Sequence, residues 1–196
     1  MIVKEAGKDV KHPPSGSYPA RCVRVIDLGT EPSFRGNPPK RKVYIGWELD
    51  KLMDDGRPHL VGAFYSATLA PKADLRALLE AWRGKELTEE ERKGFDLSVL
   101  LSKGCLLAIT TPEAGWPEVT TALRLPQGMK VPEQVNPNIS IDLNKFDVTA
   151  FNGLSDYFKQ KIMASPEYQK LQVNGSLAKS SPAAGVDDGK DEEIPF

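Results

Sequence analysis

The chain has 196 residues, of which 40 % are hydrophobic and 27 % are charged, a composition typical of a soluble globular domain with room for a tail. No run approaches the ~20 apolar residues of a membrane span, and the N-terminus has no apolar segment that would mark it for secretion. The two cysteines, Cys22 and Cys105, lie far apart, which favours a reducing cytoplasm over a disulfide scaffold.

The formal net charge of −1 hides an uneven distribution. Residues 187–196 hold five acids and one lysine, so the remainder of the chain has 25 basic and 22 acidic residues. A mildly basic body with an acidic tail is compatible with a polyanionic ligand that the tail can imitate.

Three strands are predicted in the first third of the chain, after a polar, flexible lead-in over residues 1–16. Residues 17–28 are rich in β-branched and aromatic side chains, residues 41–49 alternate between apolar and polar, and residues 60–69 are small and aromatic. Glycine and prolines make residues 29–40 a loop, and Asp54-Asp55-Gly56 is a hairpin turn.

The period then changes from strand to helix. Residues 72–82 place Leu75, Leu78, Leu79 and Trp82 at helical spacing, and Gly84 is a plausible stop. A capping box beginning at Thr88 opens a second short helix. Two further strands, 104–111 and 119–125, flank the turn Gly115-Trp116-Pro117.

This order of elements predicts a mostly β protein, a five-stranded OB-fold barrel over residues 17–126 with a helical insert between strands three and four. A small sandwich or an SH3-like barrel has a similar strand count. Residues 127–173 are expected to form an extension, and 174–196 a disordered linker and acidic tip.

The extension contains one amphipathic helix, predicted over residues 154–164. Leu154, Tyr157, Phe158 and Ile162 are assigned to its apolar stripe. The helix either packs on the barrel or acts as a separate recognition helix, and Pro166 can start a further turn.

No catalytic constellation is evident, so we expect a protein that is not an enzyme and needs no cofactor or metal. His12 and His59 have no evident partner, and two cysteines and two histidines do not supply metal-ligand spacing. Asp54 and Asp55 could chelate a cation, but such a pair before glycine is far more often a turn. A nuclease accessory domain is disfavoured because no carboxylate cluster is present.

A surface for single-stranded nucleic acid is easier to place. Single-strand binders combine cations that follow the phosphates with aromatic faces on which bases stack. The loop between the first two strands and the strands beside it supply both. The candidates are Phe34, Arg35, Lys40, Arg41, Lys42 and Tyr44, one of Phe64 and Tyr65, and the two arginines Arg21 and Arg24. Because Arg21 and Arg24 have opposite parity along their strand, one of them is expected to face solvent. Trp47 alternates with apolar residues and is assigned to the core.

The last residues carry the most specific signal. Asp191, Glu192, Glu193, Ile194, Pro195 and Phe196 place acids before a C-terminal aromatic anchor. This ending resembles the tip of bacterial single-stranded DNA-binding proteins, in which several Asp residues precede Ile-Pro-Phe. Here Glu replaces part of the Asp, and Gly189 and Lys190 interrupt the acidic run.

The resemblance extends to the body, which looks more like a bacteriophage-encoded member of that family than like the bacterial housekeeping protein. It implies a protein of the bacterial host cytoplasm that coats single-stranded DNA without strong sequence preference in phage replication, recombination or repair. The tip would recruit replication or repair proteins. A β-barrel adaptor that binds proteins and not DNA is the alternative, and RNA binding stays open because stacking ignores the 2′-OH unless a contact reads it.

Overall fold

The computed structural model describes residues 12–32, 36 and 38–173. These residues form six strands: β1 (Gly16–Glu31), β2 (Lys40–Leu52), β3 (Pro58–Ser66), β4 (Gly104–Thr110), β5 (Glu118–Leu123) and β6 (Ile139–Ile141). The helices are α1 (Asp74–Arg83), α2 (Glu89–Lys93), the 3-10 helix η1 (Leu97–Leu100), α3 (Val148–Asn152), α4 (Asp156–Met163) and α5 (Pro166–Val173). The mostly β class predicted from the sequence is therefore confirmed.

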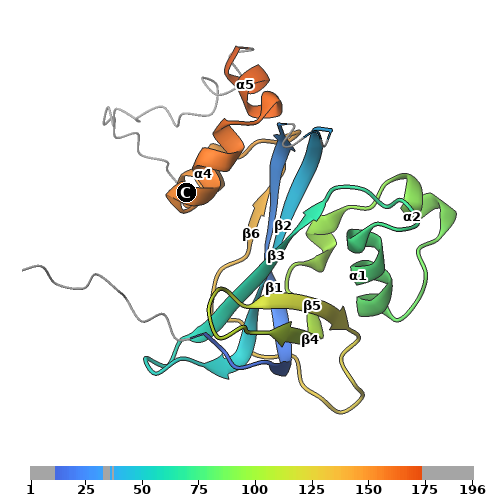
Figure 1. The fold of residues 1–196 in the computed structure, drawn as a ribbon, viewed down its shortest axis with the longest axis vertical. Helices are drawn as coiled ribbons and strands as arrows, with labels where there is room; N and C mark the ends of the chain where they lie inside the picture. The colour runs from blue at the N-terminus through green and yellow to red at the C-terminus, as the bar shows by residue number, and fades with distance from the viewer. Residues whose placement is uncertain (1–11, 33–35, 37, 174–196) are drawn as a thin grey trace, which may run out of the picture.

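The strands form a single open sheet. Its order is β3-β2-β1-β4-β5 with antiparallel neighbours, and β6 pairs with β1 in the parallel sense (Figure 1). The five predicted strands are all present, but the sheet is not closed into a barrel among the described residues. The sixth strand, β6, comes from the extension over residues 127–173, in which no strand was predicted.

A β-bulge decides which side chains of β1 face each way. The register with β2 shifts between Cys22 and Arg24, so one extra residue is inserted there. Cys22 and Val25 consequently share the face of the main core, although their numbers differ in parity. Arg24 is turned to the opposite face, which we call the outer face of the sheet.

The main core lies between the other, inner face and α1. All four residues of the predicted helical stripe are buried here, and Trp47 is fully buried against Trp82 with ring centroids 5.8 Å apart. Gly84 ends α1 in the left-handed conformation, and Thr88 makes the predicted capping box with Glu91. Figure 1 shows α1 and α2 together on this side of the long β1–β2 pair.

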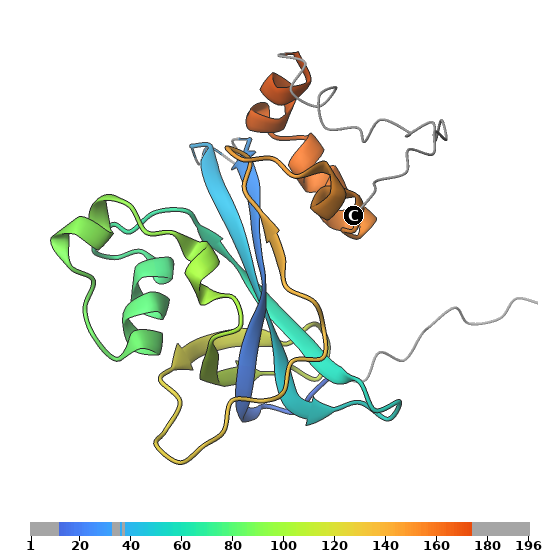
Figure 2. The same ribbon diagram turned by 180° about the vertical axis from the view of Figure 1, so that it is seen from behind.

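A second core attaches the extension to the sheet. Ile26 and Leu28 of β1 pack with residues of β6 and of helices α3 to α5, including Phe158 and Ile162. These helices lie beside the far end of the β1–β2 pair, on the side away from α1 (Figures 1 and 2). The predicted amphipathic helix therefore packs on the sheet.

Gly29 allows the close approach at this end. Its φ is 72°, and a β-carbon there would overlap the side chain of Ser165, which lies between α4 and α5. In the described part of the chain, no helix is long and apolar enough to cross a membrane.

Candidate functional site

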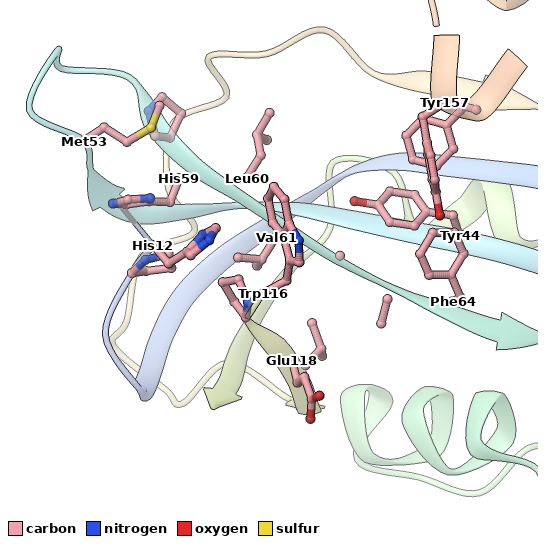
Figure 3. A pocket seen from close by; sticks show the side chains of 17 residues that line it. His12, Tyr44, Met53, His59, Leu60, Val61, Phe64, Trp116, Glu118 and Tyr157 are labelled. Atoms are coloured by element: carbon pink, nitrogen blue, oxygen red, sulfur yellow. The ribbon is translucent and has the colours of Figure 1, made fainter. Parts of the chain in front are cut away.

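A groove of about 870 Å³ runs along β3 on the side that faces the loop between β4 and β5. Its two walls come from distant parts of the chain. One wall is α4, and the other is the β4–β5 loop together with residues 12–13, as Figure 3 shows. The lining is mostly apolar, and Glu118 is the one acidic side chain that the described part of the chain contributes to it.

Two glycines leave the outer face of the sheet bare beside this groove. Gly46 of β2 pairs with Gly62 of β3, and the ring of Tyr44 lies across the surface that they leave open. A β-carbon on Gly62 would overlap the phenol of Tyr44. The absence of two side chains therefore fixes where the Tyr44 ring lies.

Four aromatic rings meet where α4 crosses this surface, and we call them the aromatic cluster. Tyr44 and Phe64 come from the sheet and lie 5.0 Å apart between centroids, whereas Tyr157 and Phe158 come from α4. The Phe158 ring covers Tyr44 at 4.7 Å and is itself buried. Burial also raises the pKa of the Tyr44 phenol above its usual value of 10.0.

The outer part of the aromatic cluster is exposed. Phe64 is 44 % exposed and Tyr157 is 54 % exposed, and their rings meet edge to face at 6.3 Å. Lys161, one turn further along α4, places its Nζ 5.7 Å from the Phe64 ring and 5.6 Å from the Tyr157 ring. The same ammonium donates to Glu31 at 2.9 Å, and this bond raises the pKa of Lys161.

The other end of the groove gathers a different set of side chains. Trp116, in the β4–β5 loop, is 72 % exposed, and its ring lies 4.9 Å from that of His12. His59 of β3 lies beside them and is largely buried (Figure 3). Burial, then the charge of Lys51, lowers the pKa of His59 from its usual 6.5.

The structure places the two aromatic candidates of β3 on opposite faces of the sheet. Phe64 lies on the outer face opposite Tyr44, and Tyr65 faces the main core opposite Val43. Tyr65 has no face on which a base could stack. Tyr44 lines the groove, but Phe64 and Phe158 cover most of its ring.

The predicted cations of β2 do not line the groove. Lys42 donates to Ser66 at 3.2 Å, and Arg41 forms an ion pair with the carboxylate of Asp27. That carboxylate also accepts from the backbone of Leu143, so Arg41 helps to hold the extension. Lys40 is exposed at the start of β2.

The expectation that Arg21 and Arg24 face opposite ways is wrong. Arg21 pairs with Glu48 and Arg24 with Gly46, and both partners point to the outer face of β2. The bulge between them reverses the parity on which the prediction depended. Arg21 donates to the carbonyl of Pro132 at 2.8 Å, whereas the Nε of Arg24 is buried without a hydrogen bond.

Two parts of the predicted site lie outside the described residues. These are Phe34 and Arg35 in the β1–β2 loop, and the whole acidic tip from Asp191 to Phe196.

Sequence reasoning missed three residues at or beside the groove: Tyr157 and Trp116 line it, and Lys161 lies next to the aromatic cluster. Tyr157 was assigned to the apolar stripe of its helix, although Phe158 follows it directly and neighbouring residues on a helix point about 100° apart. Its exposure could have been inferred from that adjacency. The signal at Trp116 was a large aromatic placed between a glycine and a proline in a strand connection.

Within the described ranges, no three His, Cys, Asp or Glu side chains gather in a way that could hold a metal ion. Cys22 and Cys105 are buried in the main core, and burial raises the pKa of the Cys22 thiol to about 12.

No protein-family model matches this chain, and a search of curated proteins finds no significant similarity.

Proposed function

We propose that this protein binds and coats single-stranded DNA without strong sequence preference, and that the groove beside β3 is its binding surface. The observation that carries the proposal is the outer part of the aromatic cluster, where Phe64 and Tyr157 are exposed under the ammonium of Lys161. The protein would act without catalysis, by stacking bases and neutralising phosphates.

The magnitudes favour stacking as the main term. One base stacked on an aromatic side chain contributes about 1–3 kcal/mol, and every base offers a π-face. Phe64 and Tyr157 together would contribute about 2–6 kcal/mol, and contacts between cations and phosphates would supply the rest of the about 8.2 kcal/mol that a micromolar Kd requires. Lys161 contributes a phosphate contact, which adds affinity that salt weakens.

The strand order supports an OB-fold as the finer description of the sheet. A five-stranded, partly open barrel with a helix after the third strand has this sequence of elements, and OB-folds bind oligonucleotides on strands two and three and the neighbouring loops. Strands β3 and β5 approach each other in space. Protection of their amides from hydrogen exchange would distinguish a closed barrel from an open sheet.

The direct test is titration of labelled dT20 with the full chain, followed by fluorescence anisotropy at two salt concentrations. We expect binding to dT20 that is much tighter than binding to a matched duplex. The same titration with an RNA strand of equal length shows whether the protein prefers deoxyribose or ribose. Absence of detectable binding to dT20 at low salt would refute the proposal.

Variants then locate the surface. Phe64→Ala and Tyr157→Ala should each weaken dT20 binding by about 5- to 150-fold, the equivalent of one stacked base. Val99→Ala is the matched control, because Val99 is an exposed apolar residue of η1 outside the groove. Equal affinity for all three variants would exclude the groove as the binding surface.

Lys161→Gln tests the cation separately. Loss of one phosphate contact should lower the slope of log K against log salt by about 0.7 for a single strand. Phe64→Ala should weaken binding and leave this slope unchanged, since it removes a ring and no charge.

We further propose that the acidic tip recruits replication or repair proteins during phage DNA metabolism in the bacterial cytoplasm. An aromatic ring preceded by acidic side chains suits an apolar pocket rimmed by basic residues. Deletion of residues 187–196 should abolish capture of such proteins from host lysate and leave dT20 binding equal or stronger. Unchanged capture would reject this role.

One observation favours a second function, that of a protein-interaction adaptor. The groove lining is mostly apolar, and among the described residues it includes no basic side chain apart from His12 and His59. An adaptor would bind no nucleic acid, and Tyr44→Ala and Lys42→Glu would leave retention on a single-stranded DNA column unaltered.

A further inference from the structure

Trp116 is an exposed ring of the groove that lies apart from the aromatic cluster. Within the described residues, His12 is the one aromatic side chain in ring contact with it, at 4.9 Å and an interplanar angle of 58°. Figure 3 shows Trp116 on the side of His12 and away from the paired rings of Phe64 and Tyr157. The groove therefore has two separate groups of exposed rings.

The fold holds the Trp116 region in place from both sides. The hydroxyl of Thr111, just after β4, donates to the carbonyl of Pro13 at 2.6 Å, and the Thr111 amide donates to Ser15 at 2.8 Å. These bonds fix the segment that carries His12 against the base of the β4–β5 loop. His12 covers part of the indole, and the rest of the indole is open to solvent.

The open part of the indole offers a face on which a flat ligand can stack. A tryptophan side chain provides up to about 250 Å² for burial, and a base stacked on an aromatic side chain contributes about 1–3 kcal/mol. The groove beside the indole is lined by Val61, Gly62 and Ala63, which leave room for a flat ligand.

The geometry points to Trp116 as a second base-stacking site, which a single strand occupies together with the aromatic cluster. This inference rests on the proposed function. From His59 to Phe64 the groove follows β3 for five steps of the strand, about 17 Å at the rise of a strand. At about 3.4 Å per nucleotide of a stacked strand, this length accommodates about five nucleotides.

Fluorescence provides a readout specific to this site. The chain has three tryptophans, and Trp47 and Trp82 are buried in the main core. A base stacked on Trp116 should quench its emission, so the fluorescence of the full chain should fall on addition of dT10. Trp116→Phe should abolish that change and keep affinity within about threefold, because the phenyl ring still offers a stacking face.

Affinity gives the second readout. Trp116→Ala should weaken dT10 binding by about 5- to 150-fold without changing the salt slope. The double variant with Phe64→Ala should lose the product of the two single losses, since the two rings share no contact. An oligonucleotide as short as dT2 cannot reach both Trp116 and Phe64. For dT2, the loss of affinity in the double variant should therefore be smaller than the product of the two single losses.

The outcomes separate this inference from the function on which it rests. If wild-type chain binds dT10 but Trp116→Ala binds it equally well and no quenching occurs, the second stacking site is refuted and the proposed function stands. If the wild-type chain binds no single strand, the proposed function itself fails. Retention of the wild-type far-ultraviolet circular dichroism spectrum by each variant shows that folding is intact.

Discussion

Gly62→Ala tests whether the bare surface under Tyr44 is required for folding. The added methyl group would overlap the Tyr44 phenol and would lie 2.7 Å from the carbonyl oxygen of Ile45. The phenol can move, but the carbonyl belongs to the β2 backbone and cannot move freely. The variant therefore forces either the Tyr44 ring or the β2–β3 pairing to shift.

The expected cost is that of overpacking, about 1–3 kcal/mol. Movement of Tyr44 also disturbs its contacts with Phe64 and Phe158, so the packing of α4 on the sheet is weakened as well. With an m-value of ~2 kcal/mol/M in urea, the unfolding midpoint should fall by about 0.5–1.5 M. Urea titration followed by circular dichroism measures this change.

Gly94→Ala is the matched control. Gly94 has an extended φ of −173°, and no atom lies within 4 Å of the position that a β-carbon would take. Its midpoint should stay within about 0.3 M of wild type, because surface substitutions usually change stability by less than 0.5 kcal/mol. Equal midpoints for the two variants would refute the argument from close packing.

A double variant identifies the cause. Tyr44→Ala removes the ring that the new methyl group meets, so the combined cost of Tyr44→Ala and Gly62→Ala should be less than the sum of the single costs. Full additivity would mean that the Ile45 carbonyl, and not the ring, limits the space.

Three further predictions concern the core and its titration. Burial lowers the pKa of His59 below 6.5, so its contribution to stability is fully present above pH 6.5 and should be lost as pH falls through the folded pKa. Urea titrations from pH 7 to 5 measure this decline in the free energy of unfolding, which should be smaller in His59→Gln. Cys22 and Cys105 should react with a thiol reagent at pH 8 only after unfolding, and rapid labelling of native protein would contradict their burial. Ile162→Ala should cost about 2–5 kcal/mol because its side chain is fully buried, whereas Met163→Ala, on an exposed side chain, should cost little; equal losses in thermal unfolding would show that α4 is not anchored by Ile162.

Local periodicity was sufficient to determine most of the secondary structure. Alternation along β2 assigned Trp47 to the core, and the spacing of Leu75, Leu78, Leu79 and Trp82 assigned the buried face of α1. Such patterns depend on neighbours a few residues apart, so the sequence displays them directly. The acidic tip, Asp191 to Phe196, was likewise recognised from the order of the last residues alone, and its role stays a prediction.

The groove depended on the tertiary structure. A bulge in β1 placed Arg21 and Arg24 on one face, and nothing in the alternation of the strand marks an inserted residue. Phe64 and Tyr157 meet because the second core seats α4 over the outer face of the sheet, and Trp116 reaches the same groove from the β4–β5 loop. These rings are far apart in the chain. Contacts between residues so distant depend on how whole strands and helices pack, and the local periodicity of the sequence carries no information about that packing.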